Sequence, residues 1–202
     1  MNTTKFYNPH FVEINENQSL MTNEYVKSNL INGNVKSNEY ILNEKVVFID
    51  YYLDISETEL VIRQLHPEID LRFHKNEVVS GEFKKYDTVQ IDLSGTITDS
   101  RIIVYNANHD FIYEKAFKVD TGEVWFIEKT YYDTVNDITY DFSYDPLTGN
   151  FLSLSIIDPF DTVDTENRTL KPADIGVGNN DYDFSWVGFE YYQNALPVLP
   201  TT

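Results

Sequence analysis

The stretch YDTVNDITY, from Tyr132 to Tyr140, indicates the fold because a related stretch precedes it in the chain. That earlier stretch, YNANHDFIY from Tyr105 to Tyr113, also has tyrosine at both ends and aspartate at its sixth position. A further aromatic-Asp-Thr-Val tetrad, FDTV at 160–163, follows Tyr132 at nearly the same interval as Tyr132 follows Tyr105. Such regular spacing predicts a repeated piece of backbone architecture, in preference to a repeated ligand-binding loop.

Three glycines mark the turns of this repeat. Gly95, Gly122 and Gly149 are equally spaced along the chain, and they end the turns DLSG, DTG and DPLTG. Glycine adopts positive φ at little cost and aspartate bonds to its own backbone, so these segments are typical of hairpin turns. Asn32-Gly33 predicts a further two-residue hairpin. We therefore expect hairpins of about 27 residues that stack into a meandering sheet.

Apolar and polar residues alternate along several segments, as they do in a strand with one buried face. Examples are 69–74, 89–93 and 151–156. This period of two predicts an all-β fold, mainly antiparallel, arranged as a meandering sheet, a sandwich or an open barrel. The best helix candidate begins like a cap at 56–59, but Val61, Ile62 and Pro67 favour a strand there.

The length of 202 residues fits a single domain, 1–202. We expect strands and a hairpin in 1–85, an acidic repeat-containing sheet in 86–192 and an extended tail in 193–202. The absence of cysteine excludes a disulfide framework and a cysteine nucleophile. Residues 1–20 lack a cationic start followed by an apolar run, and no stretch approaches the length of a membrane span, so the sequence predicts a cytoplasmic protein.

The net charge of −18 is unevenly spread along the chain. Residues 1–85 hold 13 acidic and 9 basic residues, a net charge of −4, whereas residues 86–190 hold 20 acidic and 6 basic residues, a net charge of −14. Such a field opposes direct binding to nucleic acid or to an anionic membrane. It favours a basic protein partner.

One polar cluster could carry chemistry. Asp70, Arg72 and His74 share one face of the expected strand, and three further polar residues lie close in sequence, namely Arg63, His66 and Glu68. The set could supply a general base and an anion clamp. The polar face of a half-solvated strand is the favoured interpretation, which predicts that His74→Ala leaves function nearly intact. No nucleophile elbow, phosphate-binding loop or zinc-protease motif accompanies the cluster, and no catalytic residue is assigned.

Two loops are rich in carboxylate and amide oxygens, which calcium prefers. Their residues are Asp158, Asp161, Asp164 and Glu166 in one loop, and Asn179, Asn180, Asp181 and Asp183 in the other. Neither follows the spacing of an EF-hand, so solvated turns are the favoured interpretation. The sequence predicts no bound metal and no cofactor.

The aromatic run from Tyr182 to Tyr192 predicts a strand with two apolar faces, which is either central in the core or exposes an aromatic patch. An exposed patch beside carboxylates is typical of a protein-binding site. The predicted interface comprises Asp181, Tyr182, Asp183, Trp186 and Tyr191.

Three functions remain open on these observations. The favoured one is a non-enzymatic acidic protein that occupies a basic site on another protein, such as an immunity protein or a phage-encoded inhibitor of bacterial defence. The alternative is a small-ligand or carbohydrate binder with an aromatic-lined cleft. A hydrolase that uses the residues around His74 is the third. The sequence leaves the oligomeric state undefined.

Overall fold

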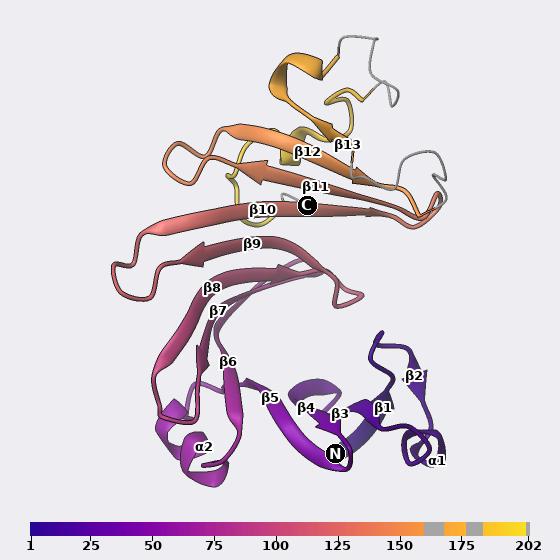
Figure 1. Cartoon of the computed structure of the whole chain (residues 1–202), viewed down its shortest axis with the longest axis vertical. Helices are drawn as coiled ribbons and strands as arrows, with labels where there is room; N and C mark the ends of the chain where they lie inside the picture. The colour runs from indigo at the N-terminus through magenta and orange to yellow at the C-terminus, as the bar shows by residue number, and fades with distance from the viewer. Residues whose placement is uncertain (160–167, 177–183, 201–202) are drawn as a thin grey trace. The chain divides into compact units, whose positions relative to one another are not determined.

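The computed structural model describes residues 1–159, 168–176 and 184–200, and within them the chain is mostly strand (Figure 1). The strands are β1 (Asn2–Tyr7), β2 (Glu13–Ile14), β3 (Glu24–Ile31), β4 (Asn34–Leu42), β5 (Lys45–Tyr52), β6 (Asp70–Ser80), β7 (Phe83–Ile91), β8 (Ile97–Tyr105), β9 (Phe111–Phe117), β10 (Val124–Asp133), β11 (Ile138–Tyr144), β12 (Phe151–Ile157) and β13 (Arg168–Leu170). The helices are α1 (Glu16–Ser19) and α2 (Glu59–Leu65), with 3-10 turns η1 (Pro172–Asp174) and η2 (Glu190–Tyr192).

The strands hydrogen-bond in the order β13-β12-β11-β10-β9-β8-β7-β6-β5-β4-β3-β1-β2, which is almost the order of the sequence. β5 and β6 pair in parallel, and α2 lies between them in the sequence, because a parallel pair needs a crossover connection. Antiparallel pairs include β3 with β4, β10 with β11, and β11 with β12. The predicted all-β, mainly antiparallel class is confirmed, and its form is an open meandering sheet.

The chain divides into two compact units. Unit 1 comprises Met1–Glu77 and Asp87–Ser100, and unit 2 comprises Val78–Tyr86 and Arg101–Thr202. The single domain expected over 1–202 stays a prediction.

The core of unit 1 joins β5, β6 and β7 to α2. Ile49, Leu71, Phe73 and Val89 are buried in the sheet, and Ile62 of α2 packs against them. The strand expected near Val61 and Ile62 is therefore wrong. Thr58 caps the helix by accepting the N–H of Val61, and burial of Ile62 outweighs the strand preference of β-branched residues.

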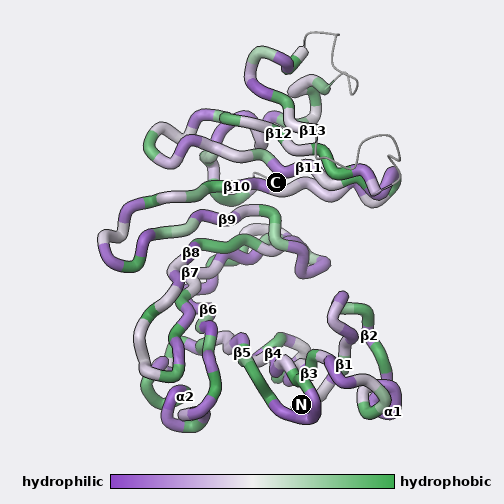
Figure 2. The backbone as a smooth tube through the Cα atoms, viewed as in Figure 1, coloured by the Kyte–Doolittle hydropathy of each residue, from purple (hydrophilic) through white to green (hydrophobic). Residues whose placement is uncertain are grey.

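The core of unit 2 is aromatic. Tyr113, Phe142, Tyr144 and Leu154 are buried in β9, β11 and β12, and Phe184 of the C-terminal segment packs on Phe142 with ring centroids 5.9 Å apart. The expected tail also contributes to this core through Ala195, Val198 and Leu199. Figure 2 shows that hydrophobic and hydrophilic stretches alternate along the backbone.

The described part of the aromatic run, 184–192, is not a strand, so that expectation is wrong there. It forms bends followed by η2. Its aromatic side chains pack on one another: the Phe184 ring lies edge-on to Phe189 with centroids 4.9 Å apart. These rings also contact Phe142 of β11 and Phe151 of β12. Such ring contacts hold the segment in place of the backbone hydrogen bonds that a strand would make.

The predicted hairpin repeat is present in the turns. Asn106 and Asp133, which directly follow the first tyrosine of their respective stretches, each accept two backbone N–H groups of the following turn through Oδ1. Asp145 does the same before Gly149, whose φ is +73°. Gly33, with φ +84°, closes the β3–β4 hairpin in the same left-handed region. The first two stretches thus form turns of the architecture, as their spacing predicts, while the third, 160–163, lies outside the described residues.

Candidate functional site

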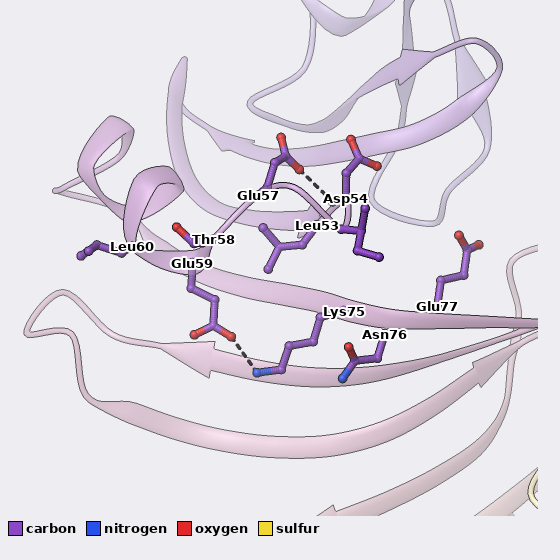
Figure 3. A pocket seen from close by; sticks show the side chains of 10 residues that line it. Leu53, Asp54, Glu57, Thr58, Glu59, Leu60, Lys75, Asn76 and Glu77 are labelled. Atoms are coloured by element: carbon purple, nitrogen blue, oxygen red, sulfur yellow. Dashed lines mark hydrogen bonds and ion pairs between the residues drawn. The ribbon is translucent and has the colours of Figure 1, made fainter.

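Unit 1 carries a pocket of about 740 Å³ between the β5–α2 connection and β6 (Figure 3). The connection supplies 53–55, 57 and 58, the start of α2 supplies 59 and 60, and β6 supplies 75–77. Among the described lining residues, four are carboxylates (Asp54, Glu57, Glu59 and Glu77) and one, Lys75, is basic. The lining therefore carries a surplus of negative charge.

Lys36 of β4 holds the β5–α2 connection in place. Its Nζ donates to the backbone carbonyl of Tyr52 at 2.9 Å and to Asp54 at 2.7 Å, and it also pairs with Glu57. Glu57 further accepts the N–H of Asp54 at 2.8 Å (Figure 3). Partial burial raises the pKa of Glu57, but the hydrogen bonds from Lys36, Asp54 and Tyr51, together with the charge of Lys36, outweigh it, so this pKa lies below its ordinary value. Glu57 is thus an anionic anchor of the loop.

A second ion pair crosses the pocket. Lys75 Nζ lies 2.7 Å from Glu59 Oε1, and in Figure 3 the two side chains point toward one another. Both side chains are about one-third exposed, so this pair contributes little to stability and can open. Asp54 and Glu77 are exposed to solvent. The pocket can therefore offer Glu77, and Glu59 once its ion pair opens, to a cation without breaking the contacts of Lys36 with Asp54 and Glu57.

Exposed apolar side chains border these carboxylates. Ile55 and Leu60 line the pocket and are exposed, and Val61 and Leu65 are exposed on α2. Carboxylates beside an apolar patch suit a segment that is both cationic and apolar.

The polar cluster predicted around His74 is assembled differently from the expected half-solvated strand. His74 is 1% exposed, and Tyr52 stacks on its ring with centroids 4.4 Å apart. His74 Nε2 lies 3.4 Å from Asp50 Oδ1, and Thr88 Oγ1 lies 3.3 Å from His74 Nδ1. The exposed polar face predicted for His74 is therefore wrong, because the neighbouring strands cover it.

Asp50 is the member of this cluster that sequence reasoning missed. Burial raises the pKa of Asp50, but the His74 hydrogen bond and the charges of His74 and Arg72 outweigh it and lower this pKa overall. Tyr40 also donates to Asp50 at 2.8 Å. The signal was an aspartate inside the apolar run VVFIDYYL, 46–53, because a buried carboxylate requires partners.

Thr88, His74 and Asp50 present a hydroxyl, an imidazole and a carboxylate in the same order as a catalytic triad does. Thr88 and His74 are each 1% exposed, so a substrate does not reach them. The arrangement satisfies buried polar groups across β5, β6 and β7 and stabilises the sheet.

The other predicted members of the cluster lie around it. Arg72 Nη1 lies 3.5 Å from Asp50 Oδ1. Arg63 Nη1 donates to the carbonyl of Ile69 and, at 3.4 Å, to that of His66. Glu68 is exposed, and Asp70 begins β6. The structure thus joins Arg72 to His74 through Asp50, while Arg63 braces the turn before β6.

The predicted interface is only partly described. Asp181, Tyr182 and Asp183 lie outside the described residues. Trp186 is half-buried with ring centroids 5.0 Å from Phe151, and the Tyr191 hydroxyl donates to the Val198 carbonyl at 2.7 Å. These two side chains contribute to packing in unit 2, and the interface as a whole stays a prediction.

The same holds for the two oxygen-rich loops. All of their residues but Asp158 lie outside the described ranges, namely Asp161, Asp164, Glu166, Asn179, Asn180, Asp181 and Asp183. Among the residues that are described, no three His, Cys, Asp or Glu side chains cluster as metal ligands would. Over those same residues, every helix is too short or too polar to cross a membrane.

Comparison with known proteins adds no relative: no family model, curated protein or solved structure matches the chain.

Proposed function

We propose that this protein is a non-enzymatic binding protein whose acidic pocket in unit 1 receives a cationic segment of another protein. One observation carries the proposal: Asp54, Glu57, Glu59 and Glu77 line a single pocket, and Lys75 is the sole basic residue among the described residues of its lining. The net charge of −18 adds long-range attraction for a basic partner.

The exposed apolar residues define the rest of the partner. Ile55 and Leu60 lie beside the carboxylates, so an arginine or lysine flanked by leucine-like residues would cover both. The charged contacts would accelerate association and select the partner, while the apolar contacts would slow dissociation. An immunity protein and a phage-encoded inhibitor of bacterial defence are two kinds of protein with this chemistry.

The test is the binding of a fluorescein-labelled tetrapeptide amide, leucine-arginine-arginine-leucine, measured by fluorescence anisotropy. The double variant Asp54→Asn/Glu77→Gln removes two exposed pocket charges and leaves Lys36 paired with Glu57. We expect about tenfold weaker binding, or about 1.4 kcal/mol.

The matched control is Glu16→Gln/Asp120→Asn, which removes two exposed charges outside the pocket. It should leave affinity within about twofold at physiological salt, where the Debye length is about 8 Å. Equal weakening by both pairs would mean that the peptide responds to overall charge, which would contradict a site at this pocket.

A further inference from the structure

A second cleft, of about 400 Å³, lies within unit 2 and has a different chemistry. Its lining comes from the start of β7, the β8–β9 turn and β9, from β10 and the turn after it, and from η2 and Pro200. Four tyrosines dominate it: Tyr131, Tyr132, Tyr191 and Tyr192. The volume lies at the lower end of the range of about 300–1,000 Å³ that is typical of small-molecule sites.

The aromatic wall is fixed before any ligand arrives. Tyr131 is 37% exposed, and its ring is braced edge-on by Phe189, with centroids 5.2 Å apart, and by Tyr192, with centroids 5.9 Å apart. Tyr192 in turn stacks on Phe142 at 4.7 Å. A ring held in this way loses little conformational entropy when a ligand packs on it.

Lys129 fixes the part of the cleft lining that Tyr191 provides. Its Nζ donates to the carbonyls of Tyr191 at 2.6 Å and Asn194 at 2.8 Å, and it lies 3.6 Å from the centre of the Tyr191 ring. Lys129 is fully buried, so its charge serves the fold and does not face the cleft. Among the described residues, the cleft lining contains the carboxylates Glu82 and Asp110 and no lysine or arginine, which disfavours an anionic ligand.

Polar groups around the rings can bind hydroxyl groups. Within the described residues the hydroxyls of Tyr131 and Tyr192 make no hydrogen bond, and Asn108 is exposed at the turn. Asp110 is held by Asn106 Nδ2 at 2.9 Å, which leaves further carboxylate acceptor positions open. The cleft thus offers phenol and amide donors beside carboxylate acceptors.

From this juxtaposition we infer that the cleft binds an uncharged carbohydrate of one or two rings. A sugar ring lays its C–H face on an aromatic ring and directs its hydroxyls to amides and carboxylates. A quaternary ammonium also favours tyrosine and carboxylate. It is less suited here, because a quaternary ammonium accepts no hydrogen bond and leaves the phenol and amide donors around the rings unused.

The test is a titration with neutral saccharides (cellobiose, maltose and N,N′-diacetylchitobiose), followed by saturation-transfer NMR and calorimetry. We expect millimolar binding or tighter of at least one. Asn108→Ala should weaken it at least threefold, and Tyr131→Ala at least tenfold in protein that keeps its circular dichroism spectrum. The matched control is Trp125→Ala, which removes an exposed aromatic side chain from the same strand outside the cleft and should leave affinity unchanged.

Tetramethylammonium chloride serves as the competing probe. Binding of tetramethylammonium without binding of any saccharide would overturn the proposal, as would an equal loss of affinity in Trp125→Ala and Tyr131→Ala. The peptide experiment on unit 1 is independent of this outcome, since the two pockets share no residue.

Discussion

His74 Nε2 lies 3.4 Å from Asp50 Oδ1, and both side chains are buried between neighbouring strands of unit 1. The contact follows from register, because the parallel pairing of β5 with β6 places Tyr52 opposite His74 and Asp50 opposite Arg72. The buried carboxylate is thereby surrounded by His74, Arg72 and the Tyr40 hydroxyl.

This contact reverses the expectation for His74→Ala. The substitution removes one partner from Asp50, which keeps Tyr40 and Arg72, and one from Thr88, so we expect the free energy of unfolding to fall by about 2–4 kcal/mol. Urea denaturation followed by circular dichroism measures it. His10→Ala, which removes an exposed histidine, is the control and should change stability by less than about 0.5 kcal/mol. Equal effects of the two substitutions would contradict the role of the buried network.

Lys129→Met should loosen the C-terminal segment. Methionine keeps the length of the side chain but loses the donors to the Tyr191 and Asn194 carbonyls, so we expect a loss of about 2–3 kcal/mol. Limited proteolysis should cut within 184–200 sooner than in the wild type. Lys115→Met, which alters a half-buried lysine of β9, should leave the cleavage pattern unchanged. If both variants were cut within 184–200 equally soon, that result would contradict anchoring of the C-terminal segment by Lys129.

Glu128 should make stability depend on pH. Burial, then the charges of Asp141 and Glu114, raises the pKa of Glu128 from 4.5 to about 7. Between pH 4.5 and about 7, the folded state holds the Glu128 proton more tightly than the unfolded state does. The stabilisation of the folded state by protonated Glu128 is therefore fully present below pH 4.5 and is lost as the pH rises through about 7.

Glu128→Gln removes that dependence. Because Glu128 is partly exposed and screened, the variant should be more stable than the wild type by about 1–2 kcal/mol at pH 8, with little difference at pH 4. Unfolding free energies across this range test the difference. In the control Glu123→Gln, a hydrogen bond from Lys118 lowers the carboxyl pKa, so the effect should have the opposite sign. A constant difference between Glu128→Gln and wild type across pH would refute the assignment.

Alanine substitutions at two glycines distinguish the cost of positive φ from the cost of close packing. Gly122 and Gly149 have φ of +71° and +73°, so alanine at either position costs about 1–2 kcal/mol. A Cβ at Gly149 would also lie 3.3 Å from Ala195 Cβ, while one at Gly122 meets nothing within 4 Å. Gly149→Ala should therefore cost about 0.5 kcal/mol more than Gly122→Ala. A double-mutant cycle with Ala195→Gly measures this contact, and zero coupling would exclude it.

The sequence by itself determined the repeat and its turns. Asp133 and Asp145 bond to backbone N–H groups two and three residues ahead, and Gly149 needs only its own positive φ. These interactions are complete within a few residues, so the local pattern specifies them. The alternation of apolar and polar residues likewise fixed the strand class.

Tertiary structure alone decided the helix α2, the burial of His74 and both pockets. Ile62 is helical because its side chain packs on the sheet, and His74 is buried because Asp50, 24 residues earlier, lies on the adjacent parallel strand. The unit 1 pocket forms where 53–60 meets 75–77. Contacts between distant segments depend on strand register and on the packing of both partners, which no local stretch of residues encodes.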